Sequence, residues 1–177
     1  MALLAVGLGL TSCTAGDPSD AAAREAQRQP APSRAAVTPA VAVLVPRERV
    51  GWFGGRCVES TQAGSPQTPT PELVEFSRQK DWYGGAGLWV TLPLWGGQRR
   101  EDGTIDHKIG WWRTVAGDLQ IVATRLDGLG TARPDVPQGY GSSGFQASGV
   151  NFSGPGCWRV VGMLHGTRLP FVISVHA

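Results

Sequence analysis

Two adjoining segments near the C-terminal end alternate between an apolar face and a mixed face. In residues 158–164 (WRVVGML) and 169–175 (LPFVISV), every second residue, counted from the first of each segment, is apolar or glycine. A period of two residues is the period of a strand with one buried face. The turn His165-Gly166-Thr167 separates the segments. The pattern therefore predicts a β-hairpin, whose inner face must be covered by another layer.

The segments that precede this hairpin indicate more strands and little helix. Aromatic and β-branched runs broken by glycine predict four further strands, in residues 88–94, 108–115, 119–126 and 145–152. Only residues 71–80 have helical character, with Thr70 as the N-cap and Pro71 in the first position. Strands without long intervening helices argue against an α/β fold and predict an all-β domain, an immunoglobulin-like β-sandwich.

The charge of the chain argues against a nucleic-acid partner. Sixteen Lys and Arg residues stand against fourteen Asp and Glu residues, which gives a net charge of +2. A nucleic-acid-binding domain normally carries a basic stripe. The longest basic cluster here is the pair Arg99-Arg100. We expect no nucleic-acid binding.

The first thirteen residues, MALLAVGLGLTSC, form an apolar and small-residue run that ends in a cysteine. The run has the length of a signal-peptide core and is shorter than the roughly 20 apolar residues that span a bilayer. Its last four residues, Leu10 to Cys13, resemble the lipobox of bacterial lipoproteins. That resemblance implies a signal peptide of residues 1–12 and lipid attachment at Cys13. No basic residue precedes the run, so we expect translation to start further upstream. The alternative is a buried N-terminal strand with an incidental cysteine.

The segment after Cys13 has the composition of a tether. Residues 14–45 are mostly Ala, Pro, Ser, Gln and Arg and contain no aromatic residue. Such a composition buries too little apolar surface to offset the entropy of ordering the chain. We predict a lipidated cysteine and disordered tether over residues 13–45, followed by one domain over residues 46–177. An ordered arm around Val41–Val45 is the alternative for the last residues of the tether.

Cys57 and Cys157 remain as a pair if Cys13 carries lipid. An exported domain lies in an oxidising compartment, where two remaining thiols usually bond. We expect a disulfide between them. The alternative is two unrelated buried thiols.

No complete catalytic constellation is present. Residues 139–144 (GYGSSG) match G-x-G-x-x-G, but a dinucleotide loop needs a preceding strand and a following helix. Ser142 and Ser143 each miss the G-x-S-x-G elbow by one residue. The three histidines lack the spacing of a zinc site, so we expect neither a metal nor a cofactor. The chain therefore more closely fits a non-enzymatic protein.

The aromatic residues are the remaining candidates for function. Adjacent residues of a strand point to opposite faces, so one of Trp111 and Trp112 should enter the core and the other should not. An outward tryptophan beside Arg113 would form a stacking platform for a sugar or a peptide. The candidate binding surface comprises Trp82, Tyr83, Trp111, Trp112 and Arg113. The alternative is that most of these aromatics fill the core.

The order of these motifs resembles a family of exported bacterial proteins of uncharacterised activity, often lipoproteins, with an immunoglobulin-like C-terminal region. The resemblance covers roughly residues 57–175 and is most specific in the last 40. Its main elements are Cys57, residues 82–90, Trp111-Trp112-Arg113, residues 119–127, residues 139–149 and residues 156–162. Family members carry an acidic residue in place of Arg159 and a proline nearer Ser153. The resemblance implies the fold and export, and no reaction.

These observations lead to one main hypothesis and two alternatives. The chain is expected to be an extracytoplasmic protein, anchored by lipid to the bacterial cell membrane or envelope, that binds a protein or glycan ligand. One alternative is an envelope hydrolase that uses Ser142 or Ser143. The other is a structural subunit of an envelope complex.

Overall fold

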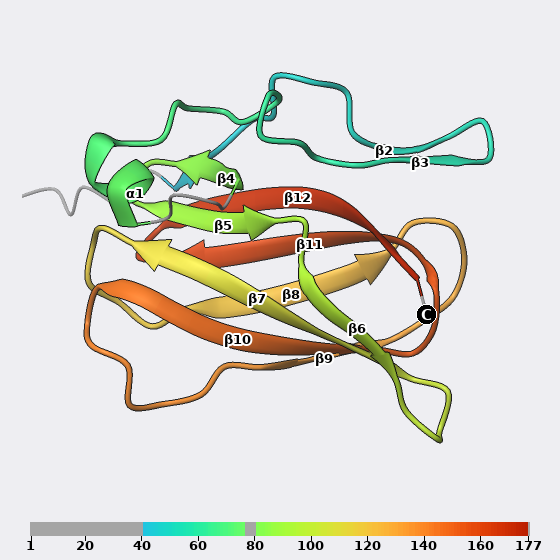
Figure 1. Ribbon diagram of the computed structural model, residues 1–177. Coiled ribbons are helices and arrows are strands. Elements are labelled where there is room, and N and C mark those ends of the chain that lie inside the picture. The colour runs from blue at the N-terminus through green and yellow to red at the C-terminus, as the bar shows by residue number, and fades with distance from the viewer. Residues whose placement is uncertain (1–40, 77–80, 177) are drawn as a thin grey trace, which may run out of the picture. The chain divides into compact units, whose positions relative to one another are not determined.

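The computed structural model of the protein describes residues 41–76 and 81–176. In this part of the chain the secondary structure is almost entirely β, as the sequence predicts, with one short helix (Figure 1). The described residues form three sheets, of four, six and two strands. The predicted signal peptide, residues 1–12, and the predicted tether up to residue 40, with Cys13, lie outside the described residues.

The four-stranded sheet has the order β1-β12-β11-β8. Its strands are β1 (Ala42–Val43), β12 (Thr167–Val175), β11 (Gly156–Leu164) and β8 (Gln120–Arg125). All pairs are antiparallel except β1, which runs parallel to β12. β1 lies inside the range predicted as tether, at the position of the alternative ordered arm. The chain therefore joins this sheet before the predicted domain boundary at residue 46.

The six-stranded sheet is antiparallel and has the order β4-β5-β7-β10-β9, with β6 also paired to β7. Its strands are β4 (Asp81–Gly85), β5 (Leu88–Leu92), β6 (Trp95–Arg99), β7 (Ile105–Arg113), β9 (Ala132–Asp135) and β10 (Gly144–Phe152). The strands predicted from the sequence correspond to β5, β7, β8, β10, β11 and β12. Short strands β1, β4, β6 and β9 carry no clear alternation and were not predicted.

The predicted hairpin is confirmed as β11 and β12. Leu164 pairs with Thr167, so the turn contains only His165 and Gly166. Both turn residues have positive φ, 43° and 80°. Two positive φ values give the turn a twist that matches the strands it joins. His165 is exposed at this turn.

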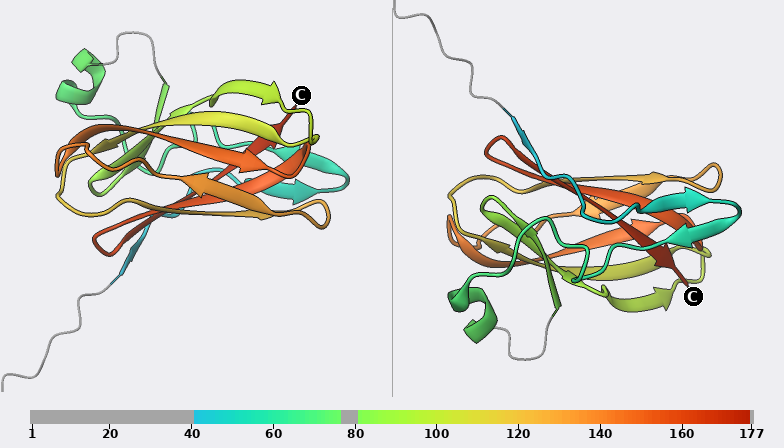
Figure 2. Two further views of the ribbon diagram at one scale, coloured as in Figure 1. Left: turned by 90° about the horizontal axis from the view of Figure 1, so that it is seen from below. Right: turned by 90° about the horizontal axis from the view of Figure 1, so that it is seen from above.

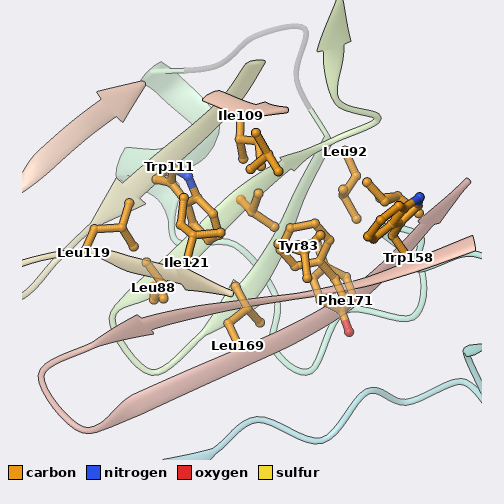
Figure 3. Close-up of a cluster of buried hydrophobic side chains, with 14 of the residues drawn as sticks. Tyr83, Leu88, Leu92, Ile109, Trp111, Leu119, Ile121, Trp158, Leu169 and Phe171 are labelled. Atoms are coloured by element: carbon orange, nitrogen blue, oxygen red, sulfur yellow. The ribbon is translucent and has the colours of Figure 1, made fainter. Parts of the chain in front are cut away.

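One hydrophobic core lies between the two large sheets and takes residues from both (Figure 3). Trp111 from β7 and Phe171 from β12 are fully buried and meet edge to face, with ring centroids 5.9 Å apart. Gly162 of β11 lets Trp111 approach, because a Cβ there would lie 2.5 Å from the indole. Gly162 therefore lies on the core face of β11, and the indole of Trp111 occupies the space that a side chain at this position would fill.

Two smaller elements flank the sheets (Figure 2). The hairpin of β2 (Gly51–Phe53) and β3 (Arg56–Val58) is tied to β11 by a disulfide between Cys57 and Cys157. Helix α1 (Pro71–Phe76) begins as predicted, since Thr70 Oγ1 accepts a hydrogen bond from Leu73 N at 3.4 Å. Leu73 is buried against Trp82 and Trp89, so α1 covers part of the outer face of the six-stranded sheet.

Candidate functional site

The predicted aromatic surface is largely inside the protein. Trp82, Tyr83 and Trp111 are 0–1% exposed, and Arg113 is 4% exposed. Only Trp112 is half-buried. Four of the five side chains of the candidate surface are therefore buried, and the alternative that most of the aromatics fill the core describes Trp82, Tyr83 and Trp111.

The reason for this burial is that both faces of the six-stranded sheet are covered. Tyr83 and Trp111 face the four-stranded sheet, while Trp82 lies beneath α1. The polar atoms of two core aromatics have partners, as buried groups usually do: Trp111 Nε1 donates to Ser148 Oγ at 2.8 Å and Tyr83 OH donates to Pro170 O at 3.3 Å. Trp158 Nε1 is buried without a partner. Burial raises the pKa of Tyr83.

The expectation that Trp111 and Trp112 point to opposite faces is confirmed. Trp111 enters the core between the sheets, whereas Trp112 packs on the outer face against Phe76 of α1, with ring centroids 4.6 Å apart. Phe76 itself is 48% exposed. The sequence identified the alternation but did not show that a helix would cover the outer face.

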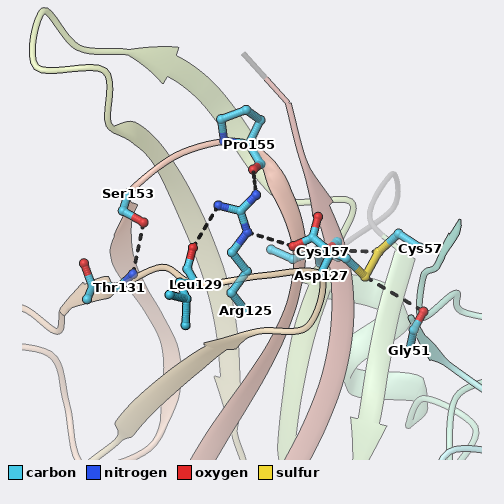
Figure 4. A network of polar contacts seen from close by, with 10 residues as sticks. Gly51, Cys57, Arg125, Asp127, Leu129, Thr131, Ser153, Pro155 and Cys157 are labelled. Atoms are coloured by element: carbon cyan, nitrogen blue, oxygen red, sulfur yellow. Dashed lines mark hydrogen bonds and ion pairs between the residues drawn. A yellow bond between two sulfur atoms is a disulfide. The ribbon is translucent and has the colours of Figure 1, made fainter. Parts of the chain in front are cut away.

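The predicted disulfide between Cys57 and Cys157 is present and closes a loop with a sequence separation of 100 residues. It lies beside a polar network around Arg125 (Figure 4). Arg125 Nε donates to Asp127 Oδ1 at 2.7 Å, Nη1 donates to Leu129 O at 3.2 Å and Nη2 donates to Pro155 O at 2.7 Å. The hydrogen bond from Arg125 lowers the pKa of Asp127.

The serine and histidine candidates lie apart. Ser142 lines a cavity of about 150 Å³ with Arg113 and Gln146, and none of the described residues that line this cavity is a histidine. His107 lines a different cavity, of about 430 Å³, and its pKa is lowered by burial. Ser143 is exposed, as are His165 and His176. The geometry gives the hydrolase alternative no support.

The outer face of the four-stranded sheet carries a groove that sequence reasoning missed. Its volume is about 470 Å³. Residues 43–50 form one wall, and the floor comprises Arg159, Val161, Arg168, Pro170 and Val172. We call this feature the outer groove. The sequence of the hairpin did indicate it, because the outward-facing residues of the two strands include valine and proline and are not all polar.

The outer groove combines apolar and basic side chains. Arg49, Arg159 and Arg168 line it and are exposed, while Glu48 is the one acidic residue among the described lining residues. Glu48 accepts a hydrogen bond from Thr61 at 3.3 Å. Val43 and Val45 of the wall are 58% and 75% exposed. A groove of this character is suited to a ligand with both anionic and apolar groups.

The described residues contain neither a candidate metal site nor a candidate membrane-spanning helix. No cluster of three or more His, Cys, Asp and Glu side chains in this part of the chain could hold a metal ion. Nor does any helix within residues 41–76 and 81–176 have the length and apolar character needed to cross a bilayer.

Comparisons of the chain with protein-family models, with curated proteins and with solved structures find no match.

Proposed function

We propose that this protein is a lipid-anchored binding module of the bacterial cell envelope, acylated at Cys13, with an immunoglobulin-like β-sandwich as its binding domain. The lipobox-like segment and the tether composition support the anchor. Two facing sheets with one shared core support the sandwich. A disulfide between Cys57 and Cys157 fits an extracytoplasmic location.

The outer groove is the observation that carries the binding function. We propose that it holds an extended segment of a partner protein with alternating acidic and aliphatic side chains. Its three arginines outnumber the single Glu48, so an acidic segment is complementary in charge. The concave shape of the groove, between residues 43–50 and strands β11 and β12, favours a segment of chain over a flat membrane surface.

The groove is tested with fluorescently labelled, extended peptides of alternating acidic and aliphatic residues, measured by fluorescence anisotropy. Members of this library are expected to bind the wild type, and the same peptides with lysine for each acidic residue are not. The double substitution Arg159→Glu and Arg168→Glu should weaken binding by a factor of ten or more. Arg133→Glu, at an exposed arginine of β9, is the matched control and should have no effect.

The competing occupant is a membrane, and vesicles containing phosphatidylglycerol provide that arm of the test. Vesicle binding that depends on Arg159 and Arg168, without any peptide binding, would overturn the peptide proposal. Failure of every acidic peptide to bind the wild type would also overturn it.

The anchor is tested separately in bacteria fed an alkyne-labelled fatty acid. Wild-type protein should take up the label and fractionate with membranes, and Cys13→Ala should do neither. Label that persists in the Cys13→Ala variant would contradict attachment at Cys13.

A further inference from the structure

Arg113 and Gln146 are two buried polar side chains at one end of the core. Arg113 ends β7 and is paired with Gly144 in β10, two residues before Gln146. Their exposed fractions are 4% and 5%. Both line the cavity of about 150 Å³, whose other walls are residues 117–119 and 136–142. We call this cavity the Arg113 pocket, and it shares no residue with the outer groove.

The guanidinium of Arg113 is only partly used by the fold. Nη1 donates to Gly117 O at 3.1 Å, and Nη2 donates to Gly141 O. Nε is shielded from solvent and has no hydrogen-bond partner. Buried polar groups nearly always have a partner, so an unpartnered charged donor in a pocket indicates a missing acceptor.

Gln146 complements this donor. Its Nε2 donates to Pro137 O at 3.2 Å, which leaves Oε1 as a buried acceptor without a partner. Two residues that line the pocket thus carry one unused charged donor and one unused acceptor. A ligand that satisfies both must bring an acceptor, preferably anionic, and a donor.

The charge of Arg113 is only partly compensated, by the nearby carboxylate of Asp118, which also lines the pocket. Among the described residues, the ion pairs are Arg100 with Asp106 and Arg125 with Asp127, and none involves Arg113. Burial lowers the pKa of Arg113, while the nearby charge of Asp118 opposes this effect. A buried cation without an ion-pair partner is unfavourable, and an anion in the pocket would relieve part of that cost.

We propose that the Arg113 pocket binds a small carboxylate that carries an N–H or O–H donor on the adjacent carbon. The carboxylate accepts from Arg113 Nε, and the adjacent donor reaches Gln146 Oε1. The C-terminal residue of a peptide and a free 2-hydroxy acid share this chemistry. The exposed Tyr140 lies at the wall of the pocket, where its ring can contact the remainder of the ligand.

Isothermal titration calorimetry of the full chain with small probes tests the site. N-acetylglycine represents the peptide terminus and lactate the hydroxy acid, and at least one should bind with a dissociation constant on the order of 1 mM. N-acetylglycinamide lacks the carboxylate and acetate lacks the adjacent donor. Each control should bind at least tenfold more weakly than the better probe. The ratio between N-acetylglycine and lactate distinguishes the two sources.

The variants assign the roles of the two residues. Arg113→Met should abolish binding, and Gln146→Met should bring the better probe to within about threefold of acetate. Arg133→Met, at an exposed arginine outside both the pocket and the outer groove, is the matched control and should leave the affinity unchanged. If neither probe binds the wild type, or if folded Arg113→Met still binds, the proposal is wrong. The wild-type arms decide the question even if Arg113→Met does not fold.

Discussion

Arg125 and Arg113 are both drawn into the domain, but the fold uses their guanidinium groups differently. Every nitrogen of Arg125 donates a hydrogen bond, one of them to the carboxylate of Asp127, and the group also lies over the ring of Trp158. Arg113 is more buried, has two carbonyl acceptors, and retains an unpartnered Nε. The hydrogen bonds of Arg125 hold the fold together, whereas Arg113 retains one donor that the fold does not use.

The surroundings of Arg125 are also more tightly linked than those of Arg113. The Arg125 network lies beside the disulfide, and Leu126 N donates to Cys157 O at 2.8 Å. The Arg113 pocket is closed by residues 136–142, which are mostly exposed and contain two glycines. Covalent and ionic links thus accumulate at Arg125, and an exposed loop lies beside Arg113. Loops on a rigid scaffold are where binding residues are commonly found.

The largest expected effect is loss of the disulfide beside Arg125. The double substitution Cys57→Ser and Cys157→Ser should lower the free energy of unfolding by about 4 to 5 kcal/mol, because the bond closes a long loop in the unfolded chain. Urea unfolding measures this loss. A change below about 1 kcal/mol would show that the β2–β3 hairpin adds little to the stability of the Arg125 region.

The next effect is the direct contrast between the two arginines. Arg125→Met should destabilise the protein by about 2 to 3 kcal/mol, since Asp127 loses its charge partner and two carbonyls lose a donor. Arg113→Met should cost less than about 1 kcal/mol, because it also removes a buried charge that forms no ion pair. Equal losses in urea unfolding would show that the two arginines do the same structural work.

A smaller effect is expected at Gly156, which lies against the Arg125 network. A Cβ at this position would meet Arg125 Nε and Asp127 Oδ1 at 2.8 Å, and the backbone has φ of 151°. Gly156→Ala should therefore cost about 1 to 3 kcal/mol. Gly139→Ala, beside the Arg113 pocket, meets no atom within 4 Å and tests only positive φ, 95°. The difference in melting temperature between the two variants gives the cost of the steric clash with the Arg125 network, apart from the cost of backbone strain.

The smallest effect concerns pH. The hydrogen bond from Arg125 holds the pKa of Asp127 below 3.8, its ordinary value, so the folded state resists protonation more than the unfolded state. The resulting stability is complete above pH 3.8 and is lost as the pH falls through the lower folded-state pKa. Asp127→Asn should lower the melting temperature at pH 7 and flatten its acid dependence. An unchanged slope below pH 3.8 would contradict a working Asp127–Arg125 pair.

The sequence predicted the strands better than the sites. Alternation in residues 158–164 and 169–175 identified β11 and β12, because a half-buried strand must alternate. Burial of Trp82 could not be predicted, since it depends on α1 packing over a sheet face that alternation alone would leave exposed. Arg113 was selected as a surface residue, and only the folded chain shows it enclosed with Gln146, a residue that no local pattern indicated.

The difference between the two arginines is measured most directly by NMR of their side-chain Nε–Hε groups. In a spectrum of ¹⁵N-labelled protein, with Arg113→Met and Arg125→Met used for assignment, addition of N-acetylglycine or lactate should shift the Arg113 signal saturably. The Arg125 signal should stay in place, because its Nε–H is already bound to Asp127. An Arg113 signal that moves with neither probe, or that moves only as much as that of Arg125, would contradict the spare donor on Arg113.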